Sequence, residues 1–140
     1  MDDIDFIKEA LKEAKKAYKK NEVPIGAVVV KNGKIIAKAH NLIEYLIDPS
    51  AHAEVIAIRR AAKKLKNWRL NNCIVYSTCE PCPICEAVLL QARINKVVFG
   101  CNTLKNVVKA KFKKSKFIRK GPILENECKT ILKKFFAKYR

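Results

Sequence analysis

The spacing of hydrophobic positions predicts four amphipathic helices. Residues 4–20 carry apolar side chains every three or four positions, with lysines on the opposite face. The same period predicts helices over 51–65, 83–92 and 125–139, the last with an inner face of Cys128, Ile131, Leu132 and Phe135. Ser50 precedes the second helix and is expected to cap it, because a serine oxygen accepts a hydrogen bond from a first-turn N–H.

Shorter apolar runs between the helices predict strands. Residues 27–30 and 35–37 flank an Asn-Gly pair, a strong signal for a hairpin because both turn positions need a positive φ. Further strands are expected over 73–76 and 96–100, and residues 40–50 are expected to form a connecting loop. Strands that alternate with helices indicate an α/β layered sheet.

The size and composition indicate one globular domain. A chain of 140 residues, 49% hydrophobic and 31% charged, buries enough surface to need no disulfides, so residues 1–140 are expected to form a single domain. No apolar run approaches the roughly 18 residues of a membrane helix. The acidic start at residues 1–5 lacks the basic region of a secretory signal, so we expect a cytoplasmic protein with no membrane contact.

The charge of the chain is strongly one-sided. Lys and Arg number 30 against 13 Asp and Glu, a formal net charge of +17. Two interpretations are open: a polyanionic partner such as RNA or DNA, or a lysine bias spread over solvated faces. Residues 102–120 hold eight cations and no carboxylate, so the segment 105–120 is a candidate contact for nucleic acid.

The candidate chemistry lies in two short motifs, H-x-E at 52–54 and P-C-x-x-C at 81–85. Each is expected where a helix begins. Cysteines three positions apart in a first turn share one face, so the sulfurs of Cys82 and Cys85 can reach one ion, and a helix start favours the thiolate that zinc requires. With His52 as the third ligand, the fourth tetrahedral position of a zinc ion stays open to water, as in catalytic rather than structural sites.

Glu54 is the natural group for proton transfer in this arrangement. It follows His52 by two residues and is expected beside the open metal position, where a carboxylate can take a proton from the water and pass it to a leaving group. These parts suit hydrolytic removal of ammonia from an aromatic amidine carbon. H-x-E followed by P-C-x-x-C is typical of zinc-dependent nucleobase deaminases.

Other interpretations of the cysteines are open. A lone C-x-x-C is also typical of redox pairs and of structural zinc sites. Cys79, Cys82 and Cys85 together match the start of a ferredoxin cluster motif, but the fourth Cys and the Pro of that motif are missing. A noncatalytic, zinc-stabilised RNA-binding module would need Cys79 as a fourth ligand. Trp68 and Phe117 are expected in the hydrophobic core rather than in base-stacking platforms.

Several segments together carry a resemblance to a known family. They are residues 22–30, 40–41, 48–54, 67–70, 80–85, 93–94, 96–100 and 121–140. With them the chain resembles the cytidine deaminase-like superfamily and, within it, the bacterial tRNA adenosine deaminases. The resemblance covers most of the chain.

The resemblance implies a fold, a reaction and an assembly. The fold is a three-layer α/β/α sandwich with a five-stranded mixed sheet, and the assembly is a homodimer. The reaction converts the wobble adenosine of a tRNA anticodon loop to inosine and uses one Zn²⁺ per chain. The site residues that it implies are the zinc ligands His52, Cys82 and Cys85, the proton shuttle Glu54, and the substrate-binding residues Asn41, Gly26 and Ala27.

Two departures from the family pattern keep a second substrate class open. Residues 102–120 contain no glycine and no histidine and are shorter than the corresponding segment of tRNA adenosine deaminases. Residues 48–59 and 78–85 look at least as much like guanine deaminases. The alternative is therefore a deaminase of a free nucleobase or nucleoside, guanine or cytosine.

Overall fold

The computed structural model of the protein describes residues 1–102 and 118–138. The helices are α1 (Asp3–Lys19), α2 (Ile43–Leu46), α3 (Ala53–Leu65), α4 (Pro83–Gln91) and α5 (Glu125–Lys138). The strands are β1 (Gly26–Lys31), β2 (Lys34–His40), β3 (Cys73–Cys79), β4 (Lys96–Cys101) and β5 (Ile118–Lys120). All four predicted helices and all four predicted strands are confirmed, with ends that differ by a few residues.

The strands form one mixed sheet in the order β2-β1-β3-β4-β5. β1 pairs antiparallel with β2 and with β3, whereas β3, β4 and β5 are parallel. The hairpin between β1 and β2 turns at Asn32 and Gly33, whose φ angles of 51° and 75° are those that the Asn-Gly pair predicts. The five-stranded mixed sheet expected from the family resemblance is confirmed.

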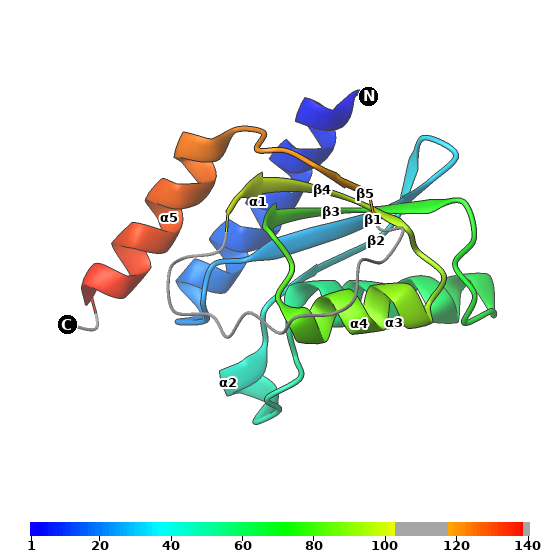
Figure 1. Ribbon diagram of the computed structural model, residues 1–140. Coiled ribbons are helices and arrows are strands. Elements are labelled where there is room, and N and C mark those ends of the chain that lie inside the picture. The colour runs from blue at the N-terminus through cyan, green and yellow to red at the C-terminus, as the bar shows by residue number, and fades with distance from the viewer. Residues whose placement is uncertain (103–117, 139–140) are drawn as a thin grey trace.

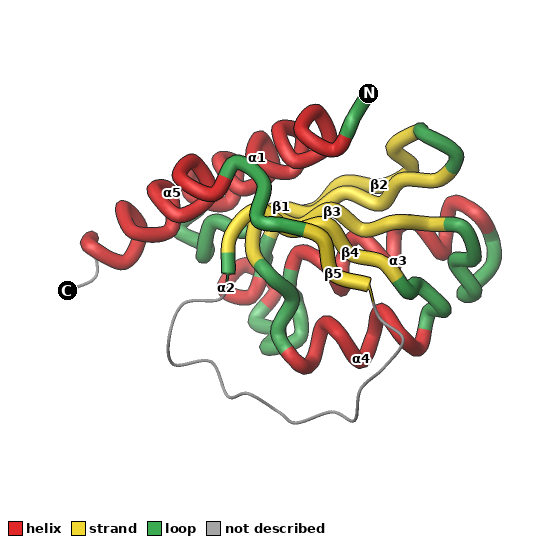
Figure 2. Tube along the Cα trace, turned by 45° about the horizontal axis from the view of Figure 1, so that its top comes forward, coloured by secondary structure: helices red, strands yellow, loops and turns green. Residues whose placement is uncertain are grey.

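Helices cover both faces of the sheet. α1 and α5 lie side by side on one face, and α3 and α4 on the other (Figures 1 and 2). Strand β1, which lies between β2 and β3, is buried on both faces, with Val28 and Val30 in the core under α1 and with Ala27 and Val29 in the core under α3. This explains its continuous apolar run, and it confirms the three-layer α/β/α sandwich.

Three local predictions are corrected. The 40–50 segment is not only a loop, because it includes the end of β2 and the single turn α2. Ser50 does not cap α3, which starts at Ala53 with His52 in the N-cap position. Trp68 is not in the core: 46% of its surface is exposed. The helical apolar stripe ends at Leu65, and the left-handed conformation of Lys66 (φ 53°) ends α3 before Trp68.

The predicted basic segment 105–120 is described only at its end. Residues 103–117, which include Phe117, lie outside the described residues. Residues 118–120 form β5, a short edge strand that the hydrophobic pattern did not indicate. Among the described helices, none combines the length and the hydrophobicity that a bilayer crossing requires.

Candidate active site

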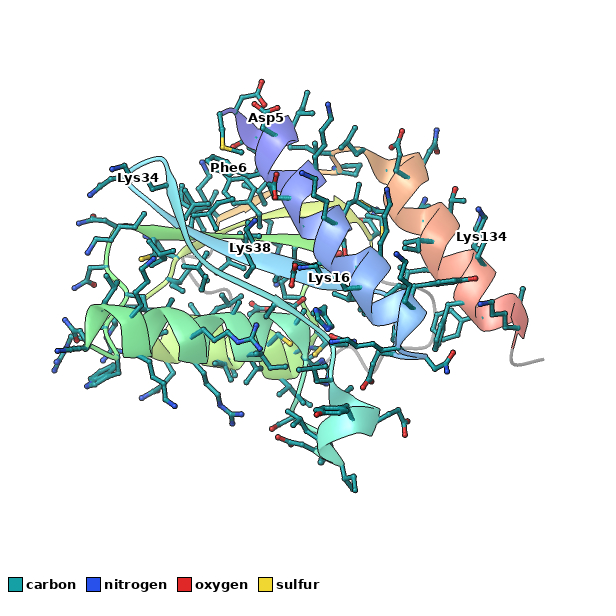
Figure 3. All side chains as sticks on the ribbon, turned by 180° about the vertical axis from the view of Figure 1, so that it is seen from behind. Asp5, Phe6, Lys16, Lys34, Lys38 and Lys134 are labelled. Atoms are coloured by element: carbon teal, nitrogen blue, oxygen red, sulfur yellow. The ribbon has the colours of Figure 1, made fainter. Side chains whose placement is uncertain are left out.

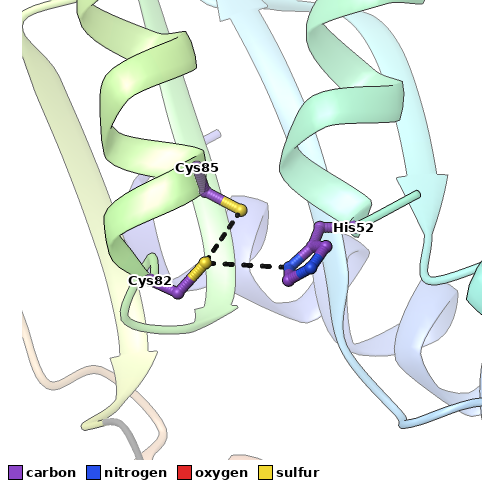
Figure 4. A group of neighbouring side chains, drawn as sticks. All are labelled: His52, Cys82 and Cys85. Atoms are coloured by element: carbon purple, nitrogen blue, oxygen red, sulfur yellow. Dashed lines mark hydrogen bonds between the residues drawn. The ribbon is translucent and has the colours of Figure 1, made fainter. Parts of the chain in front are cut away.

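The start of α3 positions His52. This residue has an extended backbone (φ −73°, ψ 149°), and its side chain makes no capping hydrogen bond. The Asn41 side chain caps the helix instead, because the Ala53 N–H donates to Asn41 Oδ1 at 2.7 Å. The Ser50 hydroxyl donates to Asp48 in the preceding turn, also at 2.7 Å. Asn41 follows the end of β2. Because it provides the cap, the His52 side chain is not used for that role, and its imidazole points toward α4 (Figure 4).

The start of α4 positions the two cysteines. Cys82 occupies the N-cap with an extended backbone, and Pro83 opens the helix, where its missing N–H costs no hydrogen bond. Cys85 lies in the first turn, and its sulfur is 3.6 Å from that of Cys82. The prediction that both motifs lie at helix starts is therefore confirmed for both helices.

His52, Cys82 and Cys85 converge on one point (Figure 4). His52 Nδ1 lies 3.8 Å from Cys82 Sγ, and the three ligand atoms all lie within 4.8 Å of one another. Ligands at about 2.3 Å from a tetrahedral zinc ion are separated by about 3.8 Å, so the donor set and its spacing fit zinc. Cys79 is not in this group, and its thiol hydrogen-bonds Cys101 instead.

The electrostatics of the group favour metal binding. The hydrogen bond with Cys85, helped by His52, lowers the pKa of Cys82 to about 4, and the thiolate is the form that binds zinc. The same hydrogen bond raises the pKa of Cys85. The contact with Cys82 raises the pKa of His52, whose ring also hydrogen-bonds the Pro49 backbone.

Glu54 lies beside this group in the first turn of α3. Only 3% of its surface is exposed, and Oε1 accepts a hydrogen bond from Ser77 Oγ at 2.7 Å. Burial raises the pKa of the Glu54 carboxyl, against the opposing hydrogen bonds with Cys85 and Ser77. A shift in this direction brings the pKa of the carboxyl closer to neutral pH, which suits a group that must both accept and return a proton.

A cavity of about 280 Å³ opens over the group. Its polar lining includes Asn41, His52, Glu54 and Cys82, and its apolar walls are Val23, Ile25, Ile43, Leu132 and Phe136. A mostly apolar pocket with a few convergent polar groups is the usual form of a site for a small ligand. Asn41 is thus the predicted substrate-binding residue that the structure brings to the cavity.

Gly26 and Ala27, the other two predicted substrate-binding residues, are not among those that line the cavity. The Gly26 N–H donates to Thr78 Oγ1 at 3.1 Å, and a Cβ at Gly26 would lie 2.0 Å from the Ala10 carbonyl oxygen of α1. Glycine is needed there for the close approach of α1. Ala27 is fully buried in the core under α3. Both residues pack the layers together, and Ile25 supplies the cavity wall next to them.

Sequence reasoning missed two kinds of contributor. Ser77 orients Glu54 through a hydrogen bond. It is a polar residue within a buried strand, and a polar residue in such an apolar run is the sequence signal that could have indicated a role for it. Leu132 and Phe136 bring α5 to the cavity from the opposite layer. Phe136 is 39% exposed beside the buried Phe135, an apolar side chain outside the inner-face pattern. Only the tertiary fold places α5 over the starts of α3 and α4.

Comparison with known proteins agrees with this geometry. The family model of the MafB19-like deaminases matches residues 1–140. The tRNA-specific adenosine deaminase of Bacillus subtilis is 45% identical over 144 residues, which cover 96% of this chain and 89% of the relative.

Two solved structures extend the comparison. One, from a study of A-to-I editing by tRNA deaminases at the wobble position of transfer RNA, has a TM-score of 0.83 and 34% identity, and covers 91% of this chain and 99% of its own. The other, guanine deaminase from Bacillus subtilis, has a TM-score of 0.69 and 40% identity, and covers 73% of this chain and 66% of its own. The chain therefore belongs to the MafB19-like deaminase family, within the cytidine deaminase-like group that its motifs predict.

Proposed function

We propose that the protein is a zinc-dependent hydrolytic deaminase that converts the wobble adenosine of a tRNA anticodon loop to inosine and releases ammonia. The observation that carries this proposal is the 45% identity to a tRNA-specific adenosine deaminase over 96% of the chain. The convergent His52, Cys82 and Cys85 group next to a buried carboxylate supports the same chemistry.

We assign one Zn²⁺ per chain to His52 Nδ1 and the sulfurs of Cys82 and Cys85, whose spacing fits a tetrahedral ion with one position left over. A zinc ion held in this way would act as a Lewis acid and would make a water nucleophile available at neutral pH. The protein's part is to hold the three donors in place. The Asn41 cap on Ala53 fixes the start of α3, and the Pro49 contact fixes the imidazole ring.

Glu54 is the proton shuttle in this proposal. Its carboxylate takes one proton from the attacking water, whose oxygen bonds to the amino-bearing carbon, and delivers that proton to the ring nitrogen of the base. It then moves the second proton of the same water, now on the hydroxyl of that carbon, to the amine, which leaves as ammonia when the C–N bond breaks and the carbonyl forms. Ser77 Oγ holds Oε1 at 2.7 Å and so limits the carboxyl to one orientation. The apolar walls of the cavity exclude bulk water around the shuttle, which strengthens these interactions.

Asn41 is the substrate-orienting residue that we propose, because it lines the cavity while its own position is fixed by the bond to Ala53. The target base must leave its stack to enter, since its reactive carbon is inaccessible within stacked RNA. The phenyl ring of Phe136 is partly exposed at the cavity wall and offers an apolar surface to the entering base. Residues 1–140 act as one domain, as a cytoplasmic homodimer, in this proposal.

A free-base deaminase is the second candidate function. Guanine deaminase from Bacillus subtilis shares 40% identity with this chain over 73% of its length. A cavity of about 280 Å³ also has room for a free purine or for cytosine. The same zinc group and Glu54 would serve that reaction, so the two candidates differ in substrate and not in chemistry.

An ammonia-release panel separates these candidates. The substrates are an anticodon stem-loop RNA with adenosine at the wobble position, guanine, cytosine and free nucleosides. Release from the stem-loop, with inosine at the target position, is the expected result. Release from guanine or cytosine alone would replace the proposal with the second candidate. No release from any of them would contradict both candidates. A salt series adds a check, because RNA affinity falls steeply with salt and free-base affinity does not.

A further inference from the structure

An exposed aromatic and cationic cluster lies outside the candidate active site. Trp68 follows α3, and the guanidinium carbons of Arg69 and Arg93 lie 4.3 and 5.3 Å from the centre of its ring system. Arg93, just past the end of α4, also donates to the Gln91 carbonyl oxygen at 3.3 Å. We call Trp68, Arg69 and Arg93 the Trp68 cluster. Cation–π contact with the indole favours this placement of both guanidinium groups before any partner binds.

The chain between α3 and the Trp68 cluster is rich in exposed cations. Six arginines and lysines and no carboxylate lie between Glu54 and Glu80. The exposed members on and just after α3 are Arg59, Arg60, Lys63, Lys64, Lys66 and Arg69. In this run only Arg59 approaches a described carboxylate, that of Asp48 at 4.0 Å.

The opposite layer carries many cations of a different kind. Lys16 on α1 and Lys134 on α5 are both exposed there (Figure 3). On α1, however, the cations alternate with carboxylates: Lys12 pairs with Glu9 at 3.0 Å and Lys16 with Glu13 at 2.7 Å. A polyanion therefore meets less opposing charge on α3 than on α1.

The Trp68 cluster and the candidate active site lie at opposite ends of α3 (Figure 1). The 13 residues of α3 make a helix about 20 Å long. His52 stands at its first turn and Trp68 beyond its last, so one nucleotide cannot contact both. The exposed cations of α3, Arg59, Arg60, Lys63 and Lys64, lie on the half of the helix nearer the Trp68 cluster, so they extend the basic surface from the cluster toward the cavity.

We propose that the Trp68 cluster binds the RNA substrate away from the target nucleotide, with the exposed cations of α3 as the path from the cavity. This inference rests on the proposed function for the identity of the polymer. Arg guanidinium groups form forked hydrogen bonds with phosphates and stack on unpaired bases, whereas the lysines contribute charge. A planar, preoriented pair of arginines on a tryptophan therefore suits RNA better than an acidic protein surface.

The test compares two charge-matched double variants. Arg69→Ala with Arg93→Ala removes two cations from the Trp68 cluster, and Lys8→Ala with Lys15→Ala removes two exposed cations from α1. Affinity for unmodified tRNA is measured across a salt series around a concentration of about 0.15 M. The first pair should weaken binding about tenfold and reduce the slope of log affinity against log salt by about two, one for each phosphate contact. The second pair should change neither by more than about twofold.

A third variant isolates the stacking geometry. Arg69→Lys with Arg93→Lys keeps both charges, so it should keep the salt slope, but it should still lose several-fold in affinity because lysine cannot form the planar fork. Equal weakening by the α1 pair would overturn the proposal in favour of unspecific charge. A changed oligomeric state with unchanged tRNA affinity would overturn it in favour of a protein interface.

The outcome also separates this inference from the proposed function. If the wild-type protein deaminates tRNA and the Arg69 and Arg93 variants bind tRNA as it does, only the inference fails. If tRNA binding depends on the two arginines but no ammonia is released from tRNA, the inference stands and the proposed function fails. If the wild-type protein does not bind tRNA, both fail.

Discussion

The starts of α3 and α4 face each other across the candidate metal position, and they are held in different ways. The start of α3 is buried: Ala53 is capped by Asn41, and Glu54 is hydrogen-bonded by Ser77. The start of α4 is held by ion pairs that lie nearer the surface. Arg119 of β5 donates to Glu80 at 2.9 Å and also to Glu86, the carboxylates on either side of the cysteine pair.

Because of this difference, the starts of α3 and α4 should respond differently to salt. Buried hydrogen bonds between groups that are shielded from water are little affected by salt. Partly exposed ion pairs are screened by salt and contribute less to stability. The α3 start should therefore fix the proton shuttle firmly, whereas the hold on the two sulfurs should depend on ionic strength.

The largest expected effect is at the buried start. Glu54→Gln preserves the shape of the side chain and its bond to Ser77 but removes the group that carries the proton. We expect ammonia release to fall about 10²–10⁴-fold while the zinc content stays at that of the wild type. Glu127→Gln, an exposed carboxylate of α5, is the matched control and should leave the rate unchanged. A Glu54→Gln protein that works at the wild-type rate would remove Glu54 from the mechanism.

The second-largest expected effect is on zinc binding at the start of α4. Cys82→Ser replaces a thiolate of low pKa with a hydroxyl that is a poor zinc ligand, so bound zinc should fall from about one per chain to nearly none. Cys73→Ser changes a buried cysteine at the other end of β3 and should leave the zinc content intact. Metal analysis of the two purified proteins makes the comparison, and full zinc in Cys82→Ser would contradict the ligand assignment.

The sequence predicted both starts because their signals are local. Each motif places its chemistry within four residues of a helix boundary, and Pro83 marks one of those boundaries directly. The partners that orient the motifs are not local. Asn41 reaches Ala53, and Ser77 reaches Glu54, only through the pairing of β1 with β2 and β3. No spacing rule connects such residues.

The errors have the same origin. Ser50 satisfies the preference for an N-cap residue, but Asp48 binds its hydroxyl and a side chain from another element takes the cap. Arg119 belongs to a segment whose sequence indicates only charge, yet β5 pairs with β4 and brings Arg119 to both glutamates. Local propensity locates elements, and tertiary packing assigns partners.

The smallest expected effect tests the salt-dependent hold on the cysteines. Arg119→Ala releases Glu80 and Glu86 and should weaken zinc affinity about tenfold, the lower end of the range for residues that orient metal ligands. Loss of a nearby cation would by itself strengthen the binding of Zn²⁺, so a weakening identifies positioning as the cause. Competition with a chromophoric chelator measures the affinity.

Lys120→Ala supplies the control for this last prediction. It removes the same charge from the next residue of β5 and breaks an ion pair with Asp3 of α1, 2.6 Å long, away from the cysteines. Its zinc affinity should stay at the wild-type value. High salt should lower the zinc affinity of the wild-type protein toward that of Arg119→Ala. It should leave the affinity of the variant nearly unchanged, because only the wild type has the Arg119 ion pairs that salt can screen. Equal weakening by both alanine variants would mean that the edge strand acts through general stability and that the two helix starts are held alike.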